Sequence, residues 1–242
     1  MIGAGAGALA GCSQTLEFPD LGLDYDATGS IRPKISVDKA ITDPGVMYAS
    51  VQEGPYALPA IPYEKVPRQF QRQIVPDPTG EQPGTIVVRL QEHHLYLVQP
   101  GGDALRYGVG IGRAGFEWSG RANIQYKKAW PTWTPPAEMI ARQPELEKWR
   151  GGRPGGPDNP LGARALYIFK DGADTGYRIH GSPEWWTIGQ NMSSGCVRMI
   201  NQDVIDLYNR VPGKATVVVA YGHGGTAGRR PCMVKIGFNL CW

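Results

Sequence analysis

The sequence predicts a mainly β domain with one helix near its C-terminal end. The 242 residues include 33 glycines and 21 prolines, a content typical of many turns between short strands. Runs rich in branched and aromatic residues begin near residue 85, whereas helical spacing of apolar residues is clearest near residue 202. Hydrophobic residues make up 41% of the chain, which is enough for a packed core.

Three strand-like runs open the predicted domain, at residues 85–90, 94–98 and 105–111. The turn between the second and third runs contains Pro-Gly-Gly-Asp, residues that favour a hairpin. Short polar turns between consecutive strands favour neighbouring antiparallel pairs. The pattern therefore predicts an antiparallel meander.

The middle of the chain is less regular. Residues 115–136 are rich in tryptophan and proline, and residues 138–149 can form a helix that Pro144 breaks or kinks. A Gly- and Pro-rich loop follows at 150–160. Residues 165–169 and 177–180 are again strand-like, with a turn at 171–176 between them.

The predicted domain ends with a helix and a strand. Asn201 is a suitable N-cap for a helix over 202–211, which Pro212 and Gly213 end, and residues 215–221 form a buried strand. We place this domain at residues 84–222. Prolines are frequent over 13–83, which predicts an extended arm with a short helical turn near 68–73, and residues 223–242 form a tail.

Three of the four cysteines lie outside the predicted domain. Residues 1–12 end in Leu-Ala-Gly-Cys, which resembles a bacterial lipobox, so Cys12 is a candidate lipid anchor and the segment a candidate signal remnant. The positive charge expected before it is missing, so either the true start lies upstream or the match is accidental. Cys232 and Cys241, with eight residues between them, form either a small disulfide loop or two separate thiols.

Charge and motif content exclude several classes of protein. The net charge of +3 is mild and suits an anionic polymer, while the absence of a Lys- or Arg-rich run argues against nucleic acid. His93 and His94 are adjacent strand residues that point to opposite faces, so they cannot chelate one ion together. We therefore expect no metal and no cofactor. We also expect no transmembrane helix, because no stretch of about 18 apolar residues occurs.

The residues that indicate chemistry lie at 180–198. His180 ends a predicted strand, and after fifteen residues Cys196 follows in a Ser-Ser-Gly bend. A nucleophilic cysteine needs a base, convergent backbone N–H groups and positive charge. His180 provides the base, Gly195 permits close backbone approach, and Arg198 provides charge to the thiolate or to a substrate carboxylate.

This segment resembles the YkuD-type L,D-transpeptidase domain, whose signature is His-Gly followed some fifteen residues later by Ser-x-Gly-Cys-x-Arg. The resemblance extends over about residues 85–221 and includes TIVVRL, HLYLV, NPLGARALYIF and the final helix and strand. It implies a β-sandwich of mostly antiparallel strands with long irregular loops and a C-terminal helix packed on the sheet. Many family members carry histidine where this chain has Ser194, which assigns the base more firmly to His180.

The resemblance further implies a two-step acyl transfer in the periplasm. Cys196 attacks a peptidoglycan tetrapeptide stem, D-Ala leaves, and an amine of another stem or of an outer-membrane protein takes the acyl group from the thioester. The carbonyl of Gly181 orients His180, and Gly195 holds the oxyanion. Substrate contacts are assigned to Ser193, Ser194 and Arg198, and groove walls to the tryptophans Trp118, Trp130, Trp133, Trp185 and Trp186.

Other interpretations of the same residues remain open. Arg198 can instead pair with Asp203, Ser193 and Ser194 can be turn residues, and Trp185 and Trp186 can pack in the core. The same cysteine and base would also serve an L,D-carboxypeptidase. A lipoprotein that only binds peptidoglycan is the alternative outside catalysis. The acyl acceptor and the oligomeric state do not follow from the sequence.

Overall fold

The computed structural model describes residues 23–25, 31–33, 43–112, 119–193 and 195–221. The chain divides into two compact units, residues 1–36 and 37–242. In the first unit, β1 (Leu23–Tyr25) pairs with β2 (Ile31–Pro33) in antiparallel orientation. The predicted signal remnant, Cys12 and the tail with Cys232 and Cys241 lie outside the described residues.

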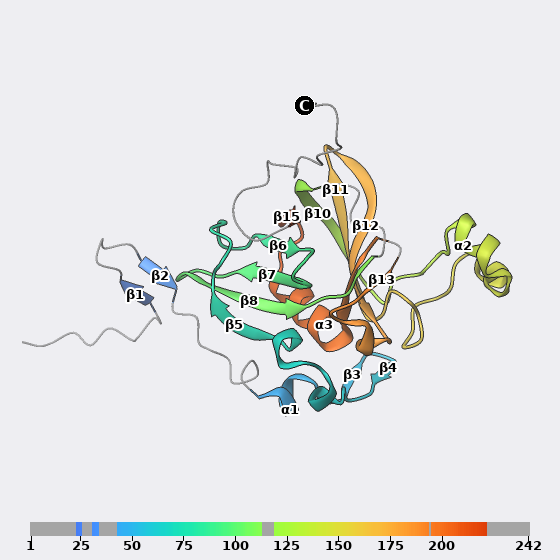
Figure 1. Ribbon diagram of the computed structural model, residues 1–242, viewed down its shortest axis with the longest axis horizontal. Coiled ribbons are helices and arrows are strands. Elements are labelled where there is room, and N and C mark those ends of the chain that lie inside the picture. Colours follow the sequence, from blue (N-terminus) through green and yellow to red (C-terminus); the bar gives the residue numbers. More distant parts are fainter. Residues whose placement is uncertain (1–22, 26–30, 34–42, 113–118, 194, 222–242) are drawn as a thin grey trace, which may run out of the picture. The chain divides into compact units, whose positions relative to one another are not determined.

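The second unit is mainly β, as predicted, and is built on a nine-stranded mixed sheet (Figure 1). The strands run in the order β14-β12-β11-β10-β15-β6-β7-β8-β5. Their bounds are β5 Gln73–Pro76, β6 Ile86–Arg89, β7 His94–Val98, β8 Asp103–Gly108, β10 Gly120–Ala129, β11 Arg164–Lys170, β12 Ala173–Ser182, β14 Val197–Ile200 and β15 Thr216–Ala220. Neighbours are antiparallel except β12 with β14 and β15 with β6.

The predicted meander is confirmed as β6, β7 and β8, paired in sequence order. The third run does not continue to Ile111 as one strand. It ends at Gly108, and Gly110 then forms a bridge with Arg198 of β14 at the other end of the sheet. The next two residues form β9 (Ile111–Gly112), which pairs in parallel with β13 (Asn191–Ser193). This crossing joins the two ends of the sheet around one core.

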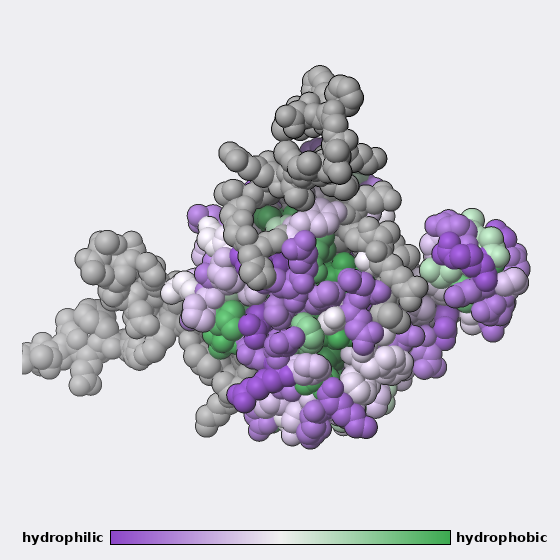
Figure 2. Space-filling model, viewed as in Figure 1, coloured by the Kyte–Doolittle hydropathy of each residue, from purple (hydrophilic) through white to green (hydrophobic). Residues whose placement is uncertain are grey.

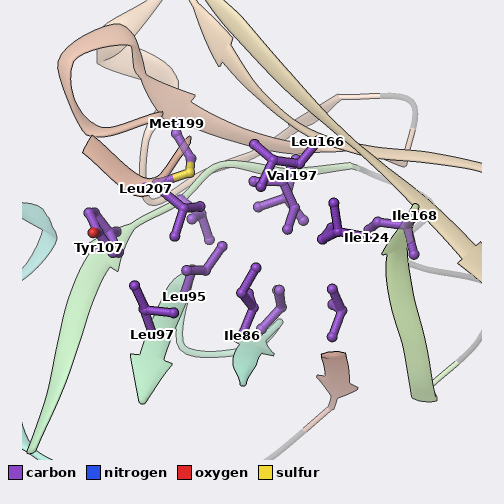
Figure 3. Close-up of a cluster of buried hydrophobic side chains, with 14 of the residues drawn as sticks. Ile86, Leu95, Leu97, Tyr107, Ile124, Leu166, Ile168, Val197, Met199 and Leu207 are labelled. Carbon is purple, nitrogen blue, oxygen red and sulfur yellow. The ribbon is translucent and has the colours of Figure 1, made fainter. Parts of the chain in front are cut away.

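The core lies between the two halves of the sheet and the C-terminal helix. Alternate residues of β6 and β7, such as Ile86, Leu95 and Leu97, face Leu166 of β11 and Val197 of β14 (Figure 3). Helix α3 (Asn201–Arg210) closes this core with Val204 and Leu207, and it contacts β11, β12 and β14. The architecture is therefore the predicted sandwich with a packed C-terminal helix.

The start of α3 corrects one prediction. Asn201 is the first residue of the helix rather than its N-cap, and Ile200 occupies the cap position without a side-chain hydrogen bond. The Asn201 Oδ1 instead accepts a hydrogen bond from the backbone N–H of Ala163 at 2.9 Å. The sequence pattern could not reveal this choice, because the partner lies 38 positions away along the chain.

Residues 43–83 do not form the extended arm that their prolines predicted. They contain α1 (Pro44–Met47), a β3–β4 hairpin (Val51–Glu53, Tyr56–Leu58), the short helices η2 (Tyr63–Lys65) and η3 (Arg68–Phe70), and edge strand β5. Met47, Tyr48 and Val66 pack with Ile188 and Ile200 in a second core. Proline interrupts regular structure but does not prevent apolar residues from packing on the body of the domain.

Two further segments differ from or refine the predictions. The Trp- and Pro-rich stretch contains the ten-residue strand β10, whose polar, exposed residues hid its strand pattern. The predicted helix over 138–149 is divided, because α2 (Ala137–Arg142) ends before Pro144 and the 3-10 helix η4 (Pro144–Trp149) follows. Helix α2 contacts η4 and lies away from the sheet (Figure 1).

On the face seen in Figure 2, hydrophilic residues surround smaller hydrophobic areas. Four large apolar side chains of the described residues are exposed: Val46, Tyr126, Trp186 and Tyr221. Among the helices that the structure describes, none has the length and hydropathy needed to cross a membrane.

Candidate active site

His180 lies near the C-terminal end of β12, beside the first residues of β14. The two strands pair in parallel, with Ile179 opposite Val197 and His180 opposite Arg198. Ile179 and Val197 are fully buried in the main core. Because strand residues alternate between faces, His180 and Arg198 lie on the face away from that core.

Cys196 joins this second face. It immediately precedes Val197, and it forms a hydrogen bond with the backbone of Arg178, two residues before His180. If the pairing is extended by one residue, Cys196 is offset by two residues from His180 across the two strands, about 8 Å between Cα atoms from the spacing and rise of β-strands. The strand register thus brings the two residues into one region, and proton transfer between imidazole and thiol stays a prediction.

The contacts of the imidazole define its tautomer. His180 Nδ1 lies 2.6 Å from the carbonyl oxygen of Gly181. A carbonyl only accepts hydrogen bonds, so Nδ1 carries the proton and Nε2 of the neutral ring keeps its lone pair. Burial lowers the pKa of His180 to about 4, against the raising effect of the Gly181 carbonyl, and the charges of Arg198 and Arg178 lower it further. The imidazole is therefore a neutral proton acceptor at pH 7.

The thiol of Cys196 starts in its neutral form. Burial raises its pKa above the ordinary value of 9.0, while its hydrogen bond with the Arg178 backbone and the charges of Arg178 and Arg198 lower it. The side chain is half-buried. A neutral thiol beside a neutral imidazole must transfer its proton before or during attack on a carbonyl carbon.

The two glycines of the motif are required by close contacts. Gly195 has a φ of 124°, and a Cβ there would lie 2.8 Å from a ring carbon of Tyr177. At Gly181 a Cβ would collide with Oδ1 of Asn201, the oxygen that anchors the start of α3. The backbone around both reacting groups is thus fixed by packing as well as by pairing.

The predicted serines are only partly described. Ser193 is the last residue of β13, whose backbone pairs with Gly112 of β9, so its main chain borders the site. Ser194 lies outside the described residues. The contributions of both serines and of the Gly195 amide to binding remain predictions.

Arg198 pairs with Glu184 and not with Asp203, the alternative that the sequence left open. Its Nη1 donates to Glu184 Oε2 at 2.8 Å, across the loop that follows β12. Asp203 is buried on the far side of α3 and faces Arg72 and Tyr48. Sequence reasoning missed Glu184 because loop residues carry no periodic signal. It also missed Arg178, although strand alternation places residue 178 on the face of residue 180.

The tryptophans do not form a single wall. Trp185, in η5 (Trp185–Thr187), packs against the second core, while Trp186 is 57% exposed and lies edge-on to Trp185 at 5.8 Å. The Trp130 ring lies 4.5 Å from that of Tyr56 of β4, tilted by 54°, and Trp133 forms a bridge with Arg153. Trp118 lies outside the described residues.

His93 and His94 do not form a metal centre. His93 has a φ of 54° and precedes β7, so the prediction that both are strand residues was wrong. Both rings lie beside Phe70, at 6.5 and 5.5 Å, and each has its own partner, Asn191 for His93 and the Gln69 carbonyl for His94. Within the described ranges, three or more His, Cys, Asp or Glu side chains nowhere gather as a metal site would require.

The tautomer and charge of His180 are directly measurable. In ¹⁵N NMR spectra we expect His180 to remain neutral and protonated at Nδ1 from pH 8 down to about pH 5, because burial lowers its pKa to about 4. The His180→Gln spectrum identifies its signals. A ring that became doubly protonated near pH 6.5, the ordinary value for histidine, would contradict the buried, neutral state.

Comparison with known proteins identifies the family of this chain. The family model of the L,D-transpeptidase catalytic domain, YkuD, matches residues 83–219. The probable L,D-transpeptidase YbiS of Escherichia coli strain K12 is 37% identical over 148 residues, which cover 59% of this chain and 45% of that protein. The probable L,D-transpeptidase ErfK/SrfK of Salmonella typhimurium is 34% identical over 148 residues, with the same coverage of 59% and 45%.

A solved structure is also similar in sequence. The crystal structure of a probable carnitine operon oxidoreductase from Brucella melitensis is 46% identical, covers 62% of this chain and 94% of that chain, and has a TM-score of 0.45. The chain spans about half the length of the curated relatives it matches, 45% for YbiS. Since the family model covers more than half of the 242 residues, the chain belongs to the L,D-transpeptidase (YkuD) catalytic domain family.

Proposed function

We propose that this chain is a cysteine-dependent L,D-transpeptidase that acts on peptidoglycan tetrapeptide stems. His180 Nε2 takes the thiol proton while the Cys196 sulfur attacks the carbonyl carbon before the terminal D-Ala. The C–N bond then breaks, the D-Ala amine takes the proton from the imidazolium, and a thioester remains. The observation that supports this proposal is the Gly181-bound imidazole on β12, which pairs with β14, the strand that directly follows Cys196.

The second half of the reaction uses the same groups. An incoming amine loses a proton to His180 as it attacks the thioester carbonyl, and the Cys196 sulfur leaves with a proton. We assign the negative oxygen of each tetrahedral intermediate to the backbone N–H groups of Gly195 and Cys196. Ser193, Ser194 and Arg198 contact the stem peptide, with Arg198 beside a carboxylate.

The proposed acceptor is the side-chain amine of a second stem, which gives a 3-3 cross-link, or a lysine of an outer-membrane protein. Both reactions belong to the cell envelope, and we place the enzyme in the periplasm. A lipid anchor at Cys12 would hold it at a membrane. If water replaces the amine, the same thioester gives tripeptide, the product of an L,D-carboxypeptidase.

A carbapenem tests the nucleophile without any choice of acceptor. We expect the protein to gain the mass of one carbapenem at Cys196, because the strained lactam carbonyl acylates an activated thiol. The Cys196→Ala variant should show no mass gain. If the wild-type protein stayed unmodified, a domain that only binds peptidoglycan would be the better interpretation.

Purified tetrapeptide muropeptides then separate transfer from hydrolysis. We expect D-Ala release together with cross-linked dimers, which liquid chromatography and mass spectrometry resolve from tripeptide monomers. Tripeptide alone would identify a carboxypeptidase and would overturn transpeptidation while leaving the thioester step intact.

A further inference from the structure

Arg178 carries a side chain that is fixed on several sides. Its two terminal nitrogens donate to the two carboxylate oxygens of Asp174, each at 2.7 Å. Nη1 also donates to the carbonyl oxygen of Tyr177 at 2.8 Å. The guanidinium carbon lies 4.3 Å from the centre of the Tyr167 ring. A planar guanidinium held by a bidentate carboxylate and an aromatic face has little rotational freedom left.

The Tyr167 ring that contacts the guanidinium is itself packed against other aromatic rings. Tyr167 stacks on Tyr126 with ring centres 4.2 Å apart and planes 21° from parallel, and Phe169 meets Tyr126 edge-on at 5.8 Å. Strand register places Tyr126 opposite Tyr167 and Tyr167 opposite Arg178. The three side chains form one row across β10, β11 and β12.

This row ends at the thiol. Ile179 pairs with Val197, so the preceding residues Arg178 and Cys196 lie opposite each other just before this pairing, and the thiol forms a hydrogen bond with the Arg178 backbone. Neighbouring strands lie about 4.8 Å apart, whereas residues two apart along a strand lie about 6.6 Å apart. The Cα atom of Arg178 is therefore nearer to that of Cys196 than to that of His180.

Other titratable groups lie around the segment that carries the thiol. His180 projects from β12 and Arg198 from β14, and Tyr177 lies against Gly195. The charge of Arg198 is partly balanced by Glu184, just as that of Arg178 is by Asp174. Both carboxylates are well exposed, at 48% for Glu184 and 41% for Asp174, so solvent screens them more than the guanidiniums they bind.

We propose that Arg178 is a positioning residue whose fixed guanidinium stabilises the Cys196 thiolate as His180 takes its proton. This inference rests on the proposed role of Cys196 as nucleophile. Transfer of the proton creates a negative sulfur and a positive imidazolium. The guanidinium favours the first and opposes the second, and its position opposite Cys196 makes the favourable effect the larger one.

The pH dependence of Cys196 alkylation by iodoacetamide tests this role, because only the thiolate reacts. We expect Arg178→Gln to move the midpoint to higher pH by about 1 unit, which slows alkylation about tenfold below the midpoint. Arg178→Lys keeps the charge and should restore most of the shift. Arg121→Gln removes an exposed arginine of β10 that pairs with Glu81, and it should leave the profile unchanged.

Asp174→Asn separates charge from packing. This substitution removes the anchor of Arg178 and also removes a negative charge beside it, so an electrostatic role predicts a midpoint that is unchanged or lower. A purely structural role predicts that Asp174→Asn and Arg178→Gln both raise the midpoint. Parallel upward shifts, or no shift in Arg178→Gln, would overturn the inference.

This readout is independent of peptidoglycan. Suppose that the wild-type protein forms the carbapenem adduct and that Arg178→Gln keeps the wild-type alkylation profile. This result would reject the proposed role of Arg178 and leave the proposed function intact. A wild-type protein that forms no adduct counts against the proposed function. If Arg178→Gln does not fold, the Arg178→Lys and Asp174→Asn profiles still distinguish charge from packing.

Discussion

Replacing His180 with glutamine lowers kcat/KM for the tetrapeptide donor by about 10²- to 10⁴-fold at pH 7, the usual contribution of a general base. Glutamine cannot accept the thiol proton at neutral pH. The variant then depends on thiol that has ionised unaided, and burial raises the pKa of Cys196 above 9.0. That population is small at pH 7.

The variant should also differ from the wild type in its pH profile. In the wild type, the neutral imidazole is available down to about pH 5, because burial lowers the pKa of His180 to about 4. The activity of His180→Gln should instead rise about tenfold per pH unit toward the pKa of the thiol, since only thiolate reacts. Steady-state kinetics between pH 5 and 9 measure both slopes.

His94→Gln is a matched control. His94 is also partly buried and its ring also contacts a backbone carbonyl, that of Gln69 at 2.9 Å, but it lies at the start of β7, a strand that pairs with neither β12 nor β14. We expect its kcat/KM to stay within about twofold of the wild type, as for a residue outside the reacting groups. Equal losses in both variants would mean that His180 supports the fold and is not the base.

The two residues proposed for the chemistry are marked by local sequence features, whereas their surroundings are not. A histidine near a strand end and a cysteine in a Ser-Gly bend are local features, and β12 pairs with β14, the strand that directly follows Cys196. The partner of Arg198 depends on a loop, and a loop has no period from which Glu184 could be inferred. The position of Arg178 could have been predicted from the sequence, because strand alternation alone places it on the same face as His180.

The same distinction between local and distant signals holds for the prediction of the fold. Strands with alternating or continuous apolar residues, such as β6 and β7, were found from the sequence, whereas β10 was missed because its outer face is polar and exposed. Contacts between distant segments decide the rest. Asn201 binds Ala163 and does not cap α3, and residues 43–83 fold back onto the domain despite their prolines.

Removing the buried side chain of Arg72 should destabilise the protein strongly. Its side chain is 5% exposed and reaches two carboxylates of α3, Asp206 at 2.8 Å and Asp203 at 3.7 Å. Its backbone N–H also donates to the Tyr48 hydroxyl, which in turn donates to Asp203. These contacts tie residues 48–72 to the helix that follows the Cys196 strand.

We expect Arg72→Leu to lower the free energy of unfolding by about 3–5 kcal/mol, the usual cost of removing one partner from a buried ion pair. Arg210→Leu is a matched control, since Arg210 pairs with the same Asp206 but is more exposed, and its loss should cost about 1 kcal/mol or less. Chemical denaturation of the two variants measures this difference. Equal costs would show that the buried network contributes no more than the surface pair.

The pH dependence of the Arg72→Leu deficit distinguishes a lost ion pair from lost packing. Burial raises the pKa of Asp203 and the charge of Arg72 lowers it. The pKa of Asp203 should therefore be higher in Arg72→Leu than in the wild type. A carboxyl whose pKa is higher in the folded than in the unfolded state binds more protons when folded, and the free energy of unfolding then falls as pH rises. The deficit should therefore be larger at pH 8 than at pH 5. A deficit that stays constant across this range would instead indicate that Arg72 stabilises the fold through the packing of its aliphatic stem.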